Sequence, residues 1–174
     1  MRILELGCGP EKVRGAIAVD INPHSAADVL ADLNKTPWPF KADVFDRVIC
    51  SHVLEHLDDL VNIMEEIYRI SRPGATVQIT VPFFSSVYAH SDVTHRHLFS
   101  TRSFNHFIQS EPVSRFRYSN ARFEKICARI VTRETSILRR FVSGLINKYS
   151  RVYEERFAYI FPRHEIYFEL RVLK

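Results

Sequence analysis

The sequence predicts an α/β fold that is built on a mostly parallel sheet, and three observations lead to this prediction. Short apolar runs that end near glycine or aspartate recur over residues 1–82, as expected of buried parallel strands. The last two runs are joined by a segment with apolar residues at helical spacing, which is typical of a strand–helix–strand unit. The chain has 174 residues, of which 46% are hydrophobic and 25% charged, as in an ordinary globular domain with one core.

The first 82 residues account for five strands and one helix. Apolar residues from Leu54 to Ile70 recur every three or four positions, and Pro73 with Gly74 is expected to end the helix that they predict. The run that reaches residue 82 is rich in β-branched side chains, which favour strands. The five expected strands cover residues 2–6, 15–20, 27–32, 45–50 and 75–82.

The middle of the chain is less regular. Residues 83–100 are polar and aromatic without a clear period. This stretch is too long for a plain connector, so we expect a functional loop there. A short helix is expected over residues 103–110. Alternation of apolar and polar side chains predicts two more strands, over residues 121–131 and 165–173.

An amphipathic helical insertion is expected between these last two strands. Residues 136–161 carry an apolar stripe opposite a row of basic side chains, with a break expected near Gly144 or Ser150. Such a segment is compatible with peripheral contact with a membrane, with a cover over the active site, with a homodimer interface, or with packing on the chain's own sheet.

Charge is distributed unevenly along the chain. Residues 1–114 hold 10 Lys/Arg and 14 Asp/Glu, whereas residues 115–174 hold 14 and 6, a local net charge of +8. A basic tail suits a phosphate-bearing partner or an anionic membrane surface, and it is equally compatible with a solvated face. The start of the chain does not read as a signal peptide, and three scattered cysteines form neither a disulfide framework nor a paired zinc motif. We therefore expect a cytoplasmic protein.

Glycine is scarce and concentrated at the start. The chain has only 5 glycines, where average usage of about 7% would give about 12, and three of them fall within the first fifteen residues. Gly7 and Gly9 follow the first strand directly, as in a dinucleotide-binding loop. Lys12 stands where that fingerprint requires its third glycine. The loop therefore does not match a nicotinamide-binding pattern.

Several further motifs occur in register with this loop, and together they resemble the class I S-adenosylmethionine-dependent methyltransferases. The resemblance covers roughly residues 1–82 and is strongest to small bacterial members of the type 11 kind. It implies a Rossmann-like fold with an antiparallel last strand, and the short spacing from Gly9 to Asp20 indicates a truncated first helix. The motifs are Leu4–Pro10, Val19–Ile21, Ala31–Leu33, Phe45–Val48, Val53–Leu57 and Arg72–Gly74.

The resemblance also implies which residues bind the cofactor, S-adenosylmethionine. Asp20 would accept the ribose hydroxyls, and Asp32 the adenine amino proton, although both are also compatible with simple strand-end caps. Backbone near Ser51 would hold the methionine ammonium. The full set of implied cofactor-binding residues is Glu5, Gly7, Cys8, Gly9, Asp20, Ile21, Asp32, Leu33 and Ser51.

The acceptor side is marked by two groups of histidines. The tip of the fourth expected strand is Cys50-Ser51-His52-Val53, not the tetrad with which related enzymes hold a planar nitrogen, so an oxygen acceptor is favoured. His52 and His95 are the candidate catalytic residues, as bases toward that acceptor. The group from His90 to His97 is compatible with a metal site or with structural hydrogen bonding in a loop. We assign no metal ligand from the sequence.

These inferences lead to one hypothesis for function and two alternatives. The first is a transferase that moves a methyl group to a hydroxyl or carboxyl oxygen of a small-molecule, sugar or lipid-linked acceptor. In family members that serve polysaccharide and lipid assembly, a pattern like Asp92–Phe99 followed by Ser103-Phe104 occurs. The alternatives are an RNA methyltransferase that uses the basic tail, with nucleic acid not favoured, and a non-catalytic methyltransferase-like binding module.

A single domain is expected to hold all of this. The cofactor half would span residues 1–82, the acceptor-side loop and helix residues 83–114, and the last strands with their insertion residues 115–174.

Overall fold

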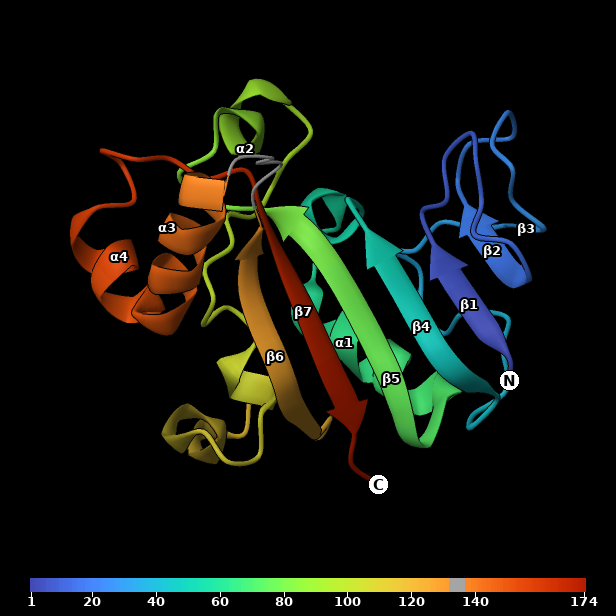
Figure 1. Cartoon of the computed structure of the whole chain (residues 1–174). Helices are drawn as coiled ribbons and strands as arrows, with labels where there is room; N and C mark the ends of the chain where they lie inside the picture. The colour runs from blue at the N-terminus through green and yellow to red at the C-terminus, as the bar shows by residue number, and fades with distance from the viewer. Residues whose placement is uncertain (132–136) are drawn as a thin grey trace.

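A computed structural model describes residues 1–131 and 137–174. Its centre is one seven-stranded sheet with the strand order β3-β2-β1-β4-β5-β7-β6 (Figure 1). The predicted mostly parallel α/β sheet with an antiparallel last strand is confirmed, because only β7 runs against its two neighbours. The strands are β1 (Ile3–Leu6), β2 (Ala16–Asp20), β3 (Val29–Leu30), β4 (Phe45–Ser51), β5 (Ser71–Pro82), β6 (Phe123–Val131) and β7 (Glu165–Val172).

Helices are few and short in the described residues. Between β1 and β2 the chain forms turns in place of a helix, which agrees with the expected truncation. None of the described helices is long and apolar enough to cross a membrane. The helices are the 3-10 turns η1 (Leu54–His56), η2 (Asn105–Phe107) and η3 (Pro112–Phe116), and the α-helices α1 (Leu60–Ile70), α2 (Val87–Ser91), α3 (Ile137–Lys148) and α4 (Ser150–Arg156).

The expected helix after β4 is split, and the prediction that Pro73 and Gly74 end it is wrong. Asp59 caps α1 by accepting from the amides of Val61 and Asn62, so η1 and α1 are separate elements. The helix ends at Ile70, and Pro73 and Gly74 already belong to β5. The chain leaves the helix early because Ser71 pairs with Phe45 at the start of β4.

The insertion is helical as expected, and its break lies at Tyr149, next to Ser150 and not at Gly144. Position 136, where the expected helix begins, lies outside the described residues. Two short helices were missed from the sequence. One is α2, which is capped by Ser86 and lies inside the loop that was expected to be aperiodic. The other is η3, which follows the predicted 103–110 helix. Of that predicted helix, only the short turn η2 forms.

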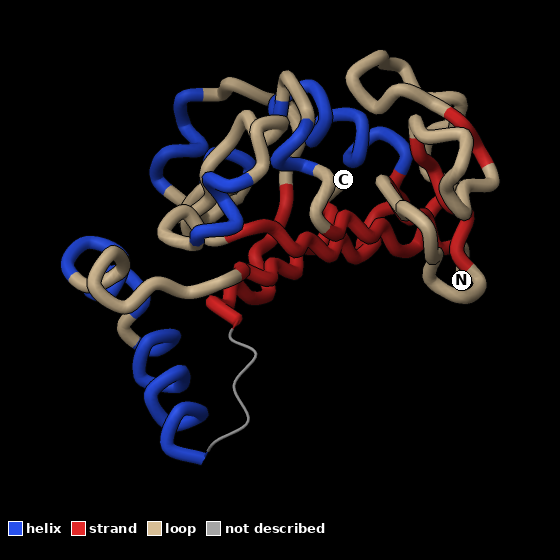
Figure 2. The backbone as a smooth tube through the Cα atoms, turned by 90° about the horizontal axis from the view of Figure 1, so that it is seen from above, coloured by secondary structure: helices blue, strands red, loops and turns tan. Residues whose placement is uncertain are grey.

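The core lies on one face of the sheet. Figure 2 shows α1 and much of the loop structure on that face, while α3 and α4 extend from the opposite side beyond the β6 edge. Val77, Ile79 and Phe168 are fully buried toward α1 and the aromatic residues of the 99–108 segment. Their neighbours Gln78 and Glu169 are polar and only half-buried. This alternation is typical of a sheet that is packed on one side and solvated on the other.

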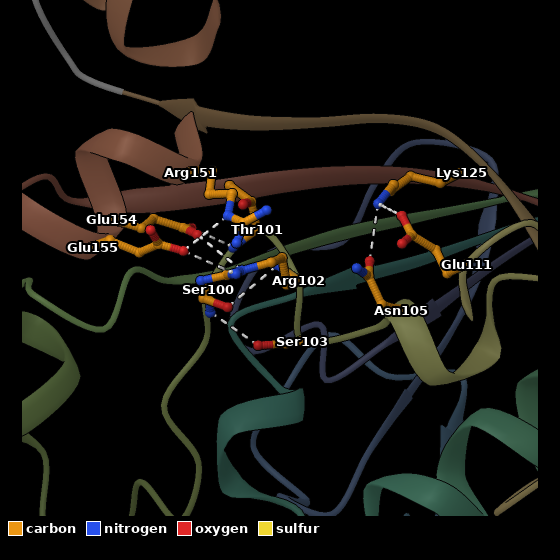
Figure 3. A network of polar contacts seen from close by, with 10 residues as sticks. All are labelled: Ser100, Thr101, Arg102, Ser103, Asn105, Glu111, Lys125, Arg151, Glu154 and Glu155. Atoms are coloured by element: carbon orange, nitrogen blue, oxygen red, sulfur yellow. Dashed lines mark hydrogen bonds and ion pairs between the residues drawn. The ribbon is translucent and has the colours of Figure 1, made fainter. Parts of the chain in front are cut away.

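Buried Glu154 ties α4 to the acceptor-side segment (Figure 3). Its Oε1 accepts from the Thr101 amide at 2.6 Å, and Oε2 lies 3.6 Å from Arg102 Nε. Tyr153 of the same helix stacks on Phe83 at the end of β5, with ring centroids 6.0 Å apart. The insertion is therefore anchored beside the loop that follows β5.

Candidate functional site

A cavity of about 370 Å³ opens at the carboxyl ends of the first strands. Parallel strands place their carboxyl ends at one edge of a sheet, where open α/β folds bind ligands. Six of the nine residues predicted to bind the cofactor line it: Gly7, Gly9, Asp20, Ile21, Asp32 and Leu33. The other lining residues are Ala31, Asn34, His52, Val53, His56 and Leu57.

The glycine loop is held by Asp20. Gly7 and Gly9 adopt φ values of +67° and +62°, a region that favours glycine. The amide of Gly9 donates to Asp20 Oδ2 at 2.8 Å, and Asn22 donates to Oδ1 at 2.9 Å. Each carboxylate oxygen has two lone-pair sites, so Asp20 keeps acceptor capacity for two further donors.

Three predicted cofactor residues lie outside the cavity lining. Glu5 is buried under the loop, where Oε2 accepts from the Val13 amide at 2.6 Å. Cys8 is buried, and its pKa is raised by burial and then by Asp20 and Glu5, so the thiol stays protonated. Ser51 ends β4 with an exposed side chain. These three residues shape the loops around the cavity, and the geometry does not bring their side chains to it.

A second cavity of about 480 Å³ adjoins the first and shares His52 and His56 with it. We call it the acceptor cavity. Both predicted catalytic histidines border it, together with residues from β5, α2 and the start of β7. Its lining consists of His52, Glu55, His56, Pro82, Tyr88, Ser91, Asp92, His95, His164 and Glu165.

His52 stands between two carboxylates at the point where the cavities meet. Its backbone has φ +51° and its amide donates to Thr80 O at 2.9 Å, so the residue turns sharply at the end of β4. Nδ1 lies 3.3 Å from Glu55 Oε1, and Nε2 lies 3.6 Å from Glu165 Oε1. Both ring nitrogens of His52 therefore face carboxylates.

Two hydrogen bonds hold the loop that carries His95 against η1. Arg96 N donates to Glu55 O at 2.7 Å, and His97 Nε2 lies 2.7 Å from Leu57 O. His95 is brought next to His56, with ring centroids 4.7 Å apart. His90 instead lies beside Phe84 O at 2.9 Å. The histidines from position 90 to 97 therefore do not converge on one point.

Asp92 organises the same loop. The pKa of this carboxyl is lowered by hydrogen bonds from the Thr94 hydroxyl and then the Thr94 amide, at 2.6 and 2.8 Å. Its Oδ2 lies 3.9 Å from His95 Nε2. An ionised carboxylate thus borders the acceptor cavity.

Sequence reasoning missed two carboxylates of this site. Glu55 lies within the Val53–Leu57 motif, yet it is buried beside the acceptor cavity and raises the pKa of Cys50, after the larger effect of that thiol's own burial. Glu165 begins β7 and is distant in sequence. Its signal was the antiparallel pairing of the last strand, because Glu165 lies opposite Pro82.

Gly7 is the position where the site is most sensitive to an added methyl group. A Cβ there would lie 2.5 Å from Val53 Cγ2, whereas a Cβ at Gly15, also at positive φ, would meet nothing within 4 Å. We expect Gly15→Ala to cost about 1–2 kcal/mol for the left-handed backbone. Gly7→Ala should cost about 1–3 kcal/mol more because of overpacking. Urea unfolding of both variants measures the difference.

The double variant Gly7→Ala/Val53→Ala provides the control for this prediction, since it removes Val53 Cγ2, the nearest overlapping atom, and leaves Val53 Cβ at 2.7 Å. It should recover part of the loss. Equal unfolding free energies for Gly7→Ala and Gly15→Ala would contradict the proposed close contact.

The comparison with known proteins starts from the sequence. A model of the methyltransferase domain family matches residues 4–79. These residues include the glycine loop, both cofactor-side aspartates, His52 and Glu55. No curated protein sequence gives a significant match.

Solved structures share the fold across nearly the whole chain. A methyltransferase dependent on S-adenosylmethionine from Archaeoglobus fulgidus is 18% identical with a TM-score of 0.60, covering 98% of this chain and 85% of its own. A Haloferax volcanii methyltransferase in complex with the activator Trm112 is 16% identical with a TM-score of 0.62, and the match covers 99% of this chain and 83% of that one. Phosphoethanolamine N-methyltransferase 2 of Haemonchus contortus, bound to S-adenosyl-L-methionine, is 15% identical with a TM-score of 0.56. The match covers 99% of this chain and 48% of that enzyme.

Identities this low establish the fold alone, and the family match concerns residues 4–79, less than half of the chain. The matched residues carry the glycine loop and the strand-end aspartates, and the fold is shared over 98% of the chain. Residues 4–79 are thus similar to the methyltransferase domain family, and the whole chain shares the fold of S-adenosylmethionine-dependent methyltransferases.

Proposed function

We propose that the protein binds S-adenosylmethionine in the first cavity and transfers its methyl group to a hydroxyl or carboxyl oxygen of an acceptor in the second. The observation that carries the proposal is the junction of the two cavities, where His52 and His56 line both. A methyl donor and an acceptor held in adjoining cavities meet at that junction. Such alignment is the main contribution that a protein makes to a displacement reaction.

The residues of the first cavity fit this cofactor. The remaining acceptor capacity of Asp20 suits the two ribose hydroxyls, and Asp32 and Leu33, which line the same cavity, would bind the adenine edge. Gly9 lines the cavity, and a Cβ there would project into open space, so glycine leaves room for a ligand close to the backbone. When bound, the cofactor supplies a methyl group on a sulfonium, whose carbon the acceptor oxygen attacks while the bonding electrons return to sulfur.

His52 is our candidate base, because it alone of the two predicted catalytic histidines borders both cavities. Its Nε2 would take the proton of an acceptor hydroxyl, while Glu55 would orient the ring through Nδ1. His95 borders only the acceptor cavity, and we assign it to binding the acceptor side.

A lipid-linked acceptor is supported by the surface next to this cavity. The end of the insertion exposes a run of apolar side chains, with Tyr159 75%, Ile160 65% and Phe161 60% exposed. Lys148 and Arg151 are exposed basic residues of the same insertion. The same segment continues into His164 and Glu165 of the acceptor cavity, and Tyr159 contacts Phe84 with ring centroids 5.4 Å apart. Apolar and basic residues together suit an anionic membrane surface.

Cofactor binding is tested by Asp20→Asn, with Asp28→Asn as the matched control. Asp28 also accepts a backbone amide of β2, from Ala18 at 2.9 Å, but it lies outside the cavity lining. Calorimetric titration with S-adenosylhomocysteine should show binding to the wild-type protein and to Asp28→Asn. Asp20→Asn should weaken it by about 10- to 100-fold, since charged hydrogen bonds contribute about 1.5–3 kcal/mol each. Absence of binding to the wild-type protein would leave only the non-catalytic alternative.

The acceptor class is tested by transfer of a labelled methyl group. Protein and methyl-labelled S-adenosylmethionine are incubated with a lipid extract or with RNA from a bacterium. We expect label in the lipid fraction, reduced by about 10²- to 10⁴-fold in His52→Gln, which is the usual contribution of a general base. Release of the label by mild alkali would indicate a carboxyl acceptor, and retention a hydroxyl. Label in RNA alone would favour the RNA alternative.

Membrane contact is tested by sedimentation with vesicles that contain anionic lipid. The wild-type protein should bind, and binding should weaken as salt is raised, because screening reduces the basic contribution. Ile160→Asp/Phe161→Asp should abolish it, while Phe116→Asp, an exposed aromatic residue on η3, should not. Loss of a dimer in solution by the double variant, without any vesicle binding of the wild-type protein, would instead assign this surface to a homodimer.

A further inference from the structure

Three side chains that do not belong to one sequence motif lie close together between the two cavities. Glu55 and His56 come from η1, and His95 comes from the loop after α2. Each offers one atom able to ligate a metal, and these atoms lie within 4.8 Å of one another. Two imidazoles and one carboxylate form a common ligand set for divalent transition metals.

One oxygen of the Glu55 carboxylate is buried without a hydrogen-bond partner among the described residues. The residue is only 1% exposed. Oε1 lies 3.3 Å from His52 Nδ1, whereas Oε2 is buried and has no hydrogen-bond partner among the described residues. Buried carboxylates are generally paired with charges or coordinate metals. An oxygen in this situation that borders a cavity points to a missing cation.

The two histidines are oriented as metal ligands usually are. His56 Nδ1 lies 2.8 Å from the Thr94 hydroxyl, which itself donates to Asp92 at 2.6 Å. His95 Nδ1 lies 3.4 Å from the carbonyl of Ala89. In metal sites the nitrogen that does not bind the ion is held by such carbonyl or carboxylate-linked partners. This arrangement leaves Nε2 of both rings as the ligand atoms.

We propose that Glu55, His56 and His95 bind one divalent transition-metal ion at the wall between the cavities. Metal–ligand distances of about 2.0–2.2 Å bring ligand atoms to about 3.4 Å from one another in a tetrahedral site. The cluster therefore needs only a small inward movement of side chains. Asp92 Oδ2, 3.9 Å from His95 Nε2, is the nearest further oxygen. The nitrogen ligands favour Zn²⁺, Fe²⁺ or Mn²⁺ over Ca²⁺.

This proposal deepens the proposed function and rests on it for the role of the ion. With three protein ligands the ion keeps open positions toward the acceptor cavity, and an acceptor oxygen can occupy one of them. A hydroxyl beside a second hydroxyl, or a carboxylate, suits such a position best. His95 would then be a ligand, and His52 would remain as the base that receives the acceptor proton.

Metal binding can be measured without cofactor or acceptor. The full chain, free of any polyhistidine tag and stripped with EDTA, is titrated with Zn²⁺ by calorimetry, and Co²⁺ absorption reports the coordination. We expect one ion per chain. Glu55→Gln and His95→Ala should each weaken binding by at least about 100-fold, since loss of mere supporting contacts already costs 10–100-fold. His90→Ala, a histidine of the same region outside the cluster, should bind as the wild type does.

Two results would overturn the proposal. One is the absence of saturable Zn²⁺ binding to the wild-type protein. The other is binding that survives both Glu55→Gln and His95→Ala. If Glu55→Gln does not fold, His56→Ala and His95→Ala decide the question in the same way.

Titration with S-adenosylhomocysteine in the presence of EDTA separates this proposal from the proposed function. Cofactor binding without Zn²⁺ binding would contradict the proposed metal site and leave the proposed methyltransferase function intact. Zn²⁺ binding without cofactor binding supports the ion site and removes the methyltransferase role.

Discussion

The contact between Gly7 and Val53 is the constraint on which the rest of the site depends. Gly7 follows β1 and its amide donates to Val19 O at 2.8 Å, so the loop after β1 is fastened to β2. Val53 follows β4 and leads directly into η1. Gly7 packs so closely on Val53 that there is no room for a Cβ atom at position 7. The two loops are therefore in direct van der Waals contact. The glycine loop therefore packs directly against the segment that leads into η1.

His52 and η1 connect the first cavity to the acceptor cavity, because His52 and His56 line both. His52 turns with positive φ at the tip of β4 while its amide pairs with Thr80 of β5. The turn places Glu55 inward and His56 along the wall. The backbone of Glu55 then receives the Arg96 amide, which draws the His95 loop onto η1. A single strand end thus sets the position of most polar groups at the junction.

The elements of the sheet, the glycine loop and the strand-end aspartates could be predicted from the sequence, because they depend on local apolar runs and on backbone conformations that only glycine adopts readily. The acceptor side could be predicted only in part. The α2 helix has five residues, too few for a period to be visible, and its N-cap Ser86 lies in an aromatic stretch. Glu165 reaches the site through antiparallel pairing with Pro82, and no local pattern encodes that register. The burial of Glu55 depends on a loop some forty residues away.

The insertion is attached to the site through the loop after β5 as well as through its own strand. Glu154 receives the Thr101 amide, and Tyr153 stacks on Phe83, while the chain beyond α4 runs back into the acceptor cavity at His164 and Glu165. The α4 helix and the chain that follows it are therefore both packed beside the acceptor cavity. On a membrane surface, this arrangement would present the acceptor cavity at a set depth and orientation, so that an acceptor head group attached to a lipid could enter without leaving the bilayer.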